Sequence, residues 1–160
     1  MIQNLLPGIQ HLQNIHPLVI HFPIAFVSGS ALFYVLALLT KRETMATTAF
    51  SLLIVGALGA AVAVGTGIYA EPSVLLAPSV RGHLLEKHQD FMILTLCVSA
   101  GLALWAIIAR PFPQKGRALF VFMLFALLGV MSVGADYGAR MVYDYNAGGS
   151  ACPQPIEFVK

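Results

Sequence analysis

The sequence predicts an all-α integral membrane protein, built as a four-transmembrane-helix up-down bundle. Of its 160 residues, 58% are hydrophobic and only 10% are charged, and the mean hydropathy is +0.81. A soluble domain carries about 25% charged residues, so this chain has too few to cover a water-facing surface. Four long apolar runs supply the spans, because each is near the ~20 residues that cross a bilayer core.

The four predicted helices cover residues 18–39, 46–69, 91–109 and 118–140, and the fourth continues a short way past its apolar run. No apolar run has a charged residue in its interior. Lipid offers the backbone no hydrogen-bond partner, so runs this continuous are expected to be helical. We expect residues 1–146 to form the transmembrane domain and residues 147–160 to form an extracytoplasmic C-terminal tail.

The loops predict how the bundle is oriented. The connections inside each helix pair are short, which favours antiparallel neighbours. Together they hold five of the nine basic residues against one acid, Glu43: Lys41, Arg42, Arg110, Lys115 and Arg117. The positive-inside rule therefore places these loops in the cytoplasm. Both termini would then be periplasmic, on the outer side of a bacterial inner (cytoplasmic) membrane, and the N-terminus lacks the basic region of a cleaved signal peptide.

All five histidines are expected at the outer face: His11, His16, His21, His83 and His88. Four of them form two HxxxxH pairs, one opening the first helix and one opening the third. Two neutral imidazoles from two helices can hold a haem iron or a smaller metal, and ionisable residues at membrane depth often mark functional sites. Histidines that only reach towards the headgroups are the structural alternative.

His21 and His88 are the first-choice axial pair for haem b, because they come at comparable depths on two parallel helices. His16 and His83 are the substitutes, or a second pair for a second haem. Five residues turn a regular helix by about 140°, so only one member of each HxxxxH pair can face a given iron. Pro17 and Pro23 can bend the first helix where it begins. No catalytic residue is predicted.

Two further features bear on this site. The second helix is rich in glycine and alanine over residues 56–67, which favours tight helix packing and would also leave room for a planar macrocycle. Asp136 and Arg140 stand four residues apart and would share a helix face. They form either a surface pair or a polar group near a haem propionate or a quinol.

Several classes of protein are excluded. The net charge of +2 and the lack of a basic run exclude a nucleic-acid partner. No CxxCH is present for covalent c-type haem attachment. No Ser/His/Asp arrangement, phosphate loop or HExxH is found, so we do not expect an enzyme that acts alone.

The stretch HPLVIHFPI at residues 16–24 resembles the HPxxxHFPI signature of DUF2231, a family of small bacterial membrane proteins. Gly65-Thr66-Gly67, His88 and residues 138–143 also resemble the family pattern, which reaches to about residue 146. The resemblance implies a four-helix membrane fold and says little about chemistry. This chain departs from the pattern at Asp136, where the family often has histidine, and at residues 143–146, where it commonly has a YEHG-like segment.

Three functions are compatible with these features. The first is a membrane-anchored b-type cytochrome-like electron-transfer subunit of a larger respiratory or redox complex, with haem held by histidines near the periplasmic face. Its partners would be other membrane or periplasmic redox subunits, and a quinol could supply its electrons. The second is a cofactor-free structural or assembly subunit of a membrane complex. The third, a small transporter or metal-handling protein, is weakest because no acid or base lies mid-helix to act as a relay.

Overall fold

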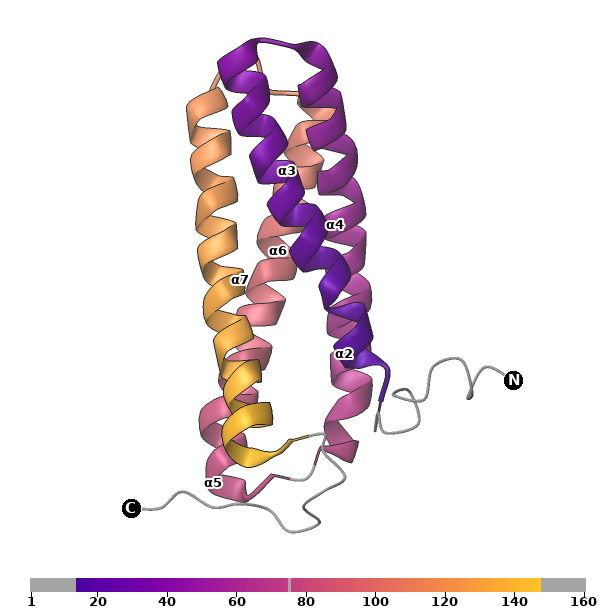
Figure 1. Cartoon of the computed structure of the whole chain (residues 1–160), viewed down its shortest axis with the longest axis vertical. Coiled ribbons are helices and arrows are strands. Elements are labelled where there is room, and N and C mark those ends of the chain that lie inside the picture. The colour runs from indigo at the N-terminus through magenta and orange to yellow at the C-terminus, as the bar shows by residue number, and fades with distance from the viewer. Residues whose placement is uncertain (1–13, 75, 148–160) are drawn as a thin grey trace, which may run out of the picture.

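The computed structural model describes residues 14–74 and 76–147, and this part of the chain forms a bundle of helices (Figure 1). The helices of the bundle are α2 (His16–Val19), α3 (His21–Thr40), α4 (Glu43–Ala70), α6 (Glu86–Ala109) and α7 (Arg117–Tyr145). Four continuous stretches, residues 16–40, 43–73, 78–109 and 117–145, are long and apolar enough to cross a membrane. The predicted all-α fold with four membrane helices is confirmed.

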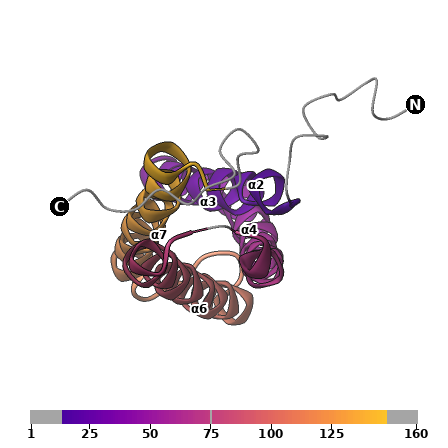
Figure 2. The same ribbon diagram turned by 90° about the horizontal axis from the view of Figure 1, so that it is seen from below.

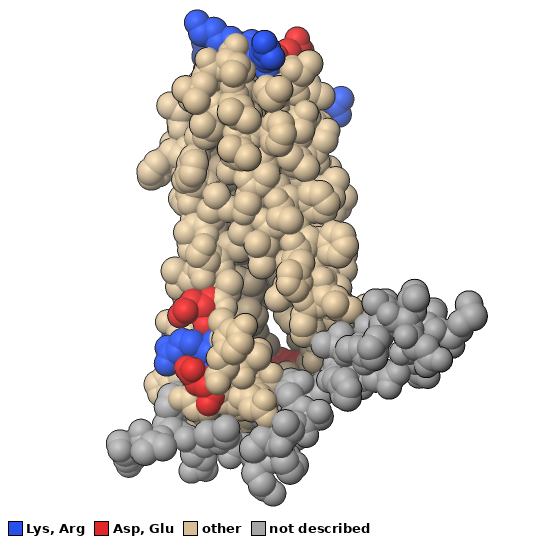
Figure 3. Space-filling model, in the orientation of Figure 1, with Lys and Arg blue, Asp and Glu red and all other residues tan. Residues whose placement is uncertain are grey.

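The helices stand in a ring in the order α3, α4, α6 and α7, so each packs against its two neighbours (Figure 2). The loops at residues 41–42 and 110–116 lie together at one end, which we call the short-loop end. The other end, the long-loop end, holds residues 71–85, the start of α2 and the end of α7 (Figure 1). Basic side chains gather at the short-loop end with a single acid beside them (Figure 3).

The helices are longer than expected at several ends. α7 runs to Tyr145, past the expected end at residue 140, and α6 begins at Glu86 rather than at residue 91. The first helix is divided at Ile20, because Pro23 has no N–H to donate to Val19. Most of the predicted C-terminal tail, residues 148–160, lies outside the described residues.

The long connection is built from three short helices, η2 (Glu71–Ser73), α5 (Pro78–Val80) and the π-helix η3 (Arg81–Leu85). The side chain of Glu71 links the two ends of this connection. One carboxylate oxygen accepts a hydrogen bond from Arg81 at 3.0 Å and the other accepts one from Gln89 at 2.9 Å. Arg81 also donates to the carbonyl of Val74 at 3.1 Å. The end of α4 is thereby tied to the start of α6.

The buried core divides into two clusters with a gap between them. The larger cluster fills the bundle from the short-loop end down to Val27 on α3 and Met131 on α7. At its centre Tyr34 is fully buried, with a tilted contact to Phe112 and an edge-to-face contact to Phe120. It donates its hydroxyl proton to the carbonyl of Pro111 at 2.9 Å.

The smaller cluster closes the long-loop end with residues that include Leu76, Val80, Leu84 and Met141. Between the two clusters the buried positions of α4 are occupied by small residues, namely Ala60, Ala63 and Ala70, and Gly134 is the buried position of α7. The buried residues of α4 and α7 at this level are therefore small, whereas the half-buried Phe91 and Met92 of α6 contact Gly134.

Glycines set the closest helix contacts. A Cβ added to Gly56 of α4 would lie 2.9 Å from Val27 Cγ2 and 3.1 Å from the Val27 backbone nitrogen of α3. A Cβ at Gly134 of α7 would lie 2.8 Å from Phe91 Cβ of α6. Helices in lipid associate through such close packing, because no hydrophobic force drives one apolar surface onto another there.

We predict that Gly56→Ala lowers the free energy of unfolding by about 1–3 kcal/mol, the usual cost of overpacking, because the new methyl meets the backbone of α3. Gly65→Ala on the same helix is the matched control, since nothing lies within 4 Å of its added Cβ. Thermal unfolding in mild detergent measures both. Equal melting temperatures for the two variants would contradict the close α3–α4 contact.

Candidate functional site

The gap between the two core clusters contains a pair of histidines. His16 comes from α2 and His88 from the first turn of α6, and their ring centroids are 6.4 Å apart with an angle of 81° between the planes. Both side chains are half-buried. The space-filling view is hollowed at this level, in its lower half, between the α7 side and the α2 side of the bundle (Figure 3).

The hydrogen bond of His88 determines which of its ring nitrogens carries the proton. Nδ1 lies 2.7 Å from the carbonyl oxygen of Gly134 on α7. A carbonyl can only accept, so Nδ1–H is the donor. The neutral ring then has its lone pair on Nε2, which is the nitrogen that commonly ligates a metal when Nδ1–H is bonded to a carbonyl.

The partners of His16 lead to the same tautomer. Its Nδ1 lies 3.1 Å from the hydroxyl oxygen of Thr66 on α4. That hydroxyl donates its own proton to the carbonyl of Ala63 at 3.0 Å, so towards His16 it can only accept. Nδ1 of His16 therefore carries the proton and Nε2 the lone pair.

Each imidazole rests on a glycine of the neighbouring helix. A Cβ at Gly67 would lie 3.0 Å from Cε1 of His16, and a Cβ at Gly138 would lie 3.0 Å from Cε1 of His88. Gly67 comes 51 positions after His16, and Gly138 comes 50 positions after His88. The α2–α4 half and the α6–α7 half thus build the same histidine-on-glycine arrangement at the same level of the bundle.

The model of one protein family, described as "Predicted membrane protein (DUF2231)", matches residues 12–151. The chain belongs to the DUF2231 family. The resemblance in its first motif predicted this membership, and it is confirmed. Neither the curated proteins nor the solved structures contain a match to the chain. The family description gives the DUF2231 chain a membrane location and no activity.

The predicted site residues of this DUF2231 chain separate into two groups. His16 and His88 meet, whereas His21 is exposed at the start of α3 and His83 is exposed within the π-helix. His21 was the first choice to pair with His88, and it is His16 that lies opposite His88. His11 lies outside the described residues. Whether any of these side chains binds a cofactor stays a prediction.

Asp136 and Arg140 do not form the pair that their spacing suggested. Asp136 is exposed, and Arg140 lies 3.6 Å from Asp144, one turn further along α7. The site also uses two residues that the sequence reasoning did not assign to it. Thr66 and Gly134 accept the Nδ1–H protons. The near-equal spacing from each histidine to its glycine, Gly67 or Gly138, is a sequence signal for the two glycines and does not locate Thr66 or Gly134.

The histidine pair offers two nitrogen ligands. Within residues 14–74 and 76–147, no group of three or more His, Cys, Asp or Glu side chains could hold a metal. Structural zinc takes four protein ligands and catalytic zinc three. A b-type haem iron takes only axial ligands from the protein, and two imidazoles can supply these.

The two Nε2 atoms are also accessible. Neither makes a hydrogen bond to a described residue, and no fully buried side-chain nitrogen or oxygen in the described part of the chain lacks a partner. The Nε2 atoms must therefore keep some open surface. Imidazole binds first-row metals at about 2.0–2.1 Å, and the two ring centroids lie 6.4 Å apart.

We predict that both rings are neutral Nδ1–H tautomers in the protein without added ligand. The ¹⁵N chemical shifts of histidine-labelled protein distinguish the two tautomers directly. Thr66→Val removes the acceptor and should let the His16 ring populate the Nε2–H form, whereas Thr66→Ser keeps the hydroxyl and should preserve the wild-type spectrum. An Nε2–H tautomer at His88 in the wild type would contradict its bond to Gly134.

Proposed function

We propose that this protein is a membrane-anchored, b-type cytochrome-like electron-transfer subunit, with haem b held between His16 and His88. One observation carries the proposal: Nδ1 of each imidazole lies within hydrogen-bond distance of an oxygen acceptor, which favours a lone pair on Nε2. The two rings also come from opposite halves of the bundle and lie at one level. Histidine ligands of metals are usually held by a second-shell acceptor in this way.

The surrounding residues would hold and orient such a group. Gly134 and Thr66 fix the direction of each ring, and their hydrogen bonds raise the basicity of the ligating nitrogen. Gly67 and Gly138 provide the space that a side chain would otherwise fill. The two apolar clusters lie on either side of the histidine level and would limit access of water. When bound, haem supplies one-electron transfer at a potential set by these ligands and by burial.

One haem is favoured over two. The second candidate pair would need His21 and His83, and both side chains are exposed on different helices. His83 instead lines a cavity of about 480 Å³ at the long-loop end, together with Lys87, Tyr137 and Arg140. Lys87 and Tyr137 directly precede His88 and Gly138 in the chain, so this cavity is a candidate place for a quinol or for a partner subunit to exchange electrons.

A second candidate function is a cofactor-free structural or assembly subunit. It is supported by the same pair of rings, because a T-shaped contact between two aromatic groups is also a stable packing arrangement. The described chain offers no group that completes a catalytic cycle alone. In either case we propose that the protein works with other membrane or periplasmic subunits in a bacterial inner membrane.

The haem proposal predicts which histidines matter. Replacing His16 or His88 with alanine should abolish the absorbance bands of the dithionite-reduced protein, because each removes one axial ligand. The matched variants His21→Ala and His83→Ala should keep them. Absorbance spectra of protein purified in mild detergent, with haem quantified per chain, test all four.

The two glycines that contact the imidazole rings, Gly67 and Gly138, provide an independent test of the haem proposal. Gly67→Ala and Gly138→Ala should lower haem content because the added methyl displaces the ring, whereas Gly65→Ala and Gly129→Ala, with open space at the added Cβ, should not. Haem-free wild-type protein from a haem-sufficient host, or full haem content in His16→Ala, would leave the structural subunit as the function.

The charge distribution predicts the orientation. All five basic residues of the short loops lie at one end of the bundle, so we propose that this end is cytoplasmic. A reporter inserted at residue 43 should then read as cytoplasmic, and one fused after residue 160 as periplasmic. A cytoplasmic C-terminal reporter would reverse the orientation and place the histidine pair near the inner face.

A further inference from the structure

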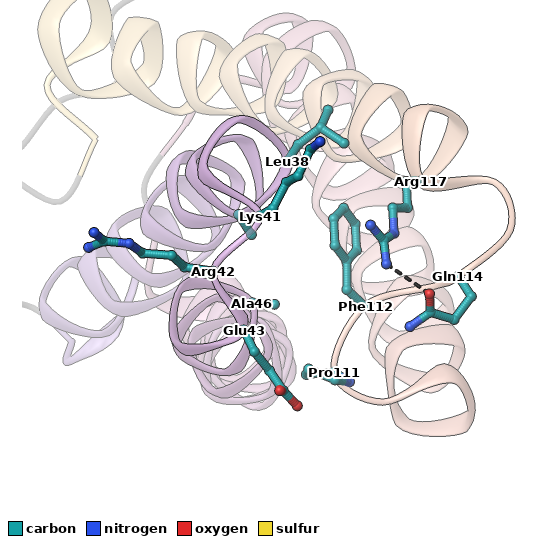
Figure 4. A pocket seen from close by; sticks show the side chains of 10 residues that line it. Leu38, Lys41, Arg42, Glu43, Ala46, Pro111, Phe112, Gln114 and Arg117 are labelled. Atoms are coloured by element: carbon teal, nitrogen blue, oxygen red, sulfur yellow. Dashed lines mark hydrogen bonds between the residues drawn. The ribbon is translucent and has the colours of Figure 1, made fainter.

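A second cavity lies at the short-loop end, far from the histidine pair along the bundle axis. It has a volume of about 430 Å³ and is enclosed by the end of α3, the start of α4, the 110–116 loop and the start of α7 (Figure 4). Its charged lining residues are Lys41, Arg42, Glu43 and Arg117. The guanidinium of Arg42 points away from the other lining side chains, so the cations on the two walls are Lys41 and Arg117, with Glu43 as the one acid (Figure 4).

Arg117 is held in place from its own side of the cavity. Its Nε donates to the carbonyl of Pro113 at 3.1 Å and one terminal nitrogen donates to Oε1 of Gln114 at 2.9 Å. The guanidinium also lies over the Phe112 ring, 5.2 Å from its centroid. These contacts use only part of the donor set. The remaining N–H groups make no hydrogen bond to a described residue, so they are available to an anion.

The protein offsets the positive charge of the cavity only with Glu43. The ion pairs in the described part of the chain, Arg81–Glu71 and Arg140–Asp144, both lie towards the long-loop end. Glu43 approaches neither Lys41 nor Arg117 closely enough to form one. Lys41 ends α3 in the left-handed region with φ of 56°, and its side chain runs beside Leu38 on the wall opposite Arg117 (Figure 4).

The rest of the lining is apolar and continues onto the lipid-facing surface. Ala37 and Phe112 are buried in the wall, and Leu38 is 39% exposed at the edge. The cavity lies where the membrane helices end, at the level of the phospholipid headgroups. A ligand that suits both parts carries an anionic group for the cations and an apolar part for the surface beside Leu38.

We propose that this cavity binds the phosphodiester headgroup of an anionic phospholipid, with the acyl chains lying on the apolar surface beside Leu38. Basic pockets between transmembrane helices are a common form of headgroup site. Arg117 supplies a planar set of donors suited to phosphate oxygens, and Lys41 supplies a flexible second cation.

Native mass spectrometry of the full-length protein tests the proposal. After supplementation with phosphatidylglycerol or with phosphatidylcholine of the same acyl chains, phosphatidylglycerol adducts should predominate. Lys41→Gln and Arg117→Gln should each lower their occupancy by about fivefold, the loss expected for one cation beside an anionic lipid. Lys115→Gln is the matched control, because Lys115 lies at the same end and does not line the cavity.

Three results would overturn the proposal. Equal retention of both lipids would show no preference for an anionic headgroup, and an equal loss of occupancy in Lys115→Gln would indicate general attraction to the basic end. Displacement of phosphatidylglycerol by millimolar inorganic phosphate would indicate a site for a free anion. If Arg117→Gln fails to fold, Lys41→Gln decides alone, because the Lys41 side chain makes no hydrogen bond within the described chain. Unchanged circular dichroism confirms that a variant is folded.

Discussion

Close approach of neighbouring helices is the constraint on which the rest of this structure depends. In lipid, helices gain stability from short-range packing rather than from leaving water, so contact must be tight wherever it occurs. Gly56 brings α4 onto the backbone of α3, and Gly134 brings α7 onto Phe91 of α6. The same two helices, α4 and α7, contact the rings of His16 and His88 through Gly67 and Gly138. Glycines at different levels of the bundle therefore provide both the tight helix packing and the space for the two imidazoles.

The fold class could be predicted from the sequence because it depends on composition and on the length of apolar runs, and both are properties of the chain itself. The histidine pair could be predicted only in part. The five-residue spacing of each HxxxxH pair indicates that one member faces inward and does not say which one. Two local distortions decide it: Pro23 interrupts the first helix at Ile20, and the π-helix before Glu86 changes the turn that carries His83. Neither distortion has a periodic signature in the sequence.

The other buried polar side chains of the bundle form hydrogen bonds to backbone carbonyls. Ser30 donates to the carbonyl of Ala49 across the α3–α4 contact at 2.9 Å, whereas Thr95 and Ser99 bond to carbonyls of their own helix. Such bonds use the single proton of each hydroxyl, so no donor is left for a ligand. His16 and His88 differ because each uses one ring nitrogen in this way and leaves the other as an acceptor. A ring nitrogen without a hydrogen bond, rather than the presence of histidine as such, distinguishes these candidate ligands from the other polar side chains of the interior.

The π-helix at Arg81–Leu85 has a consequence for how this chain can change over evolutionary time. A π turn holds one more residue than an α turn, and such turns often arise at functional sites. Deleting that residue would rotate everything before it by about 100° relative to α6 and carry Arg81 away from Glu71. The π turn thus sets the direction in which the long connection leaves α6, and a one-residue change there would break the bond from Arg81 to Glu71 while His88 kept its place on α6.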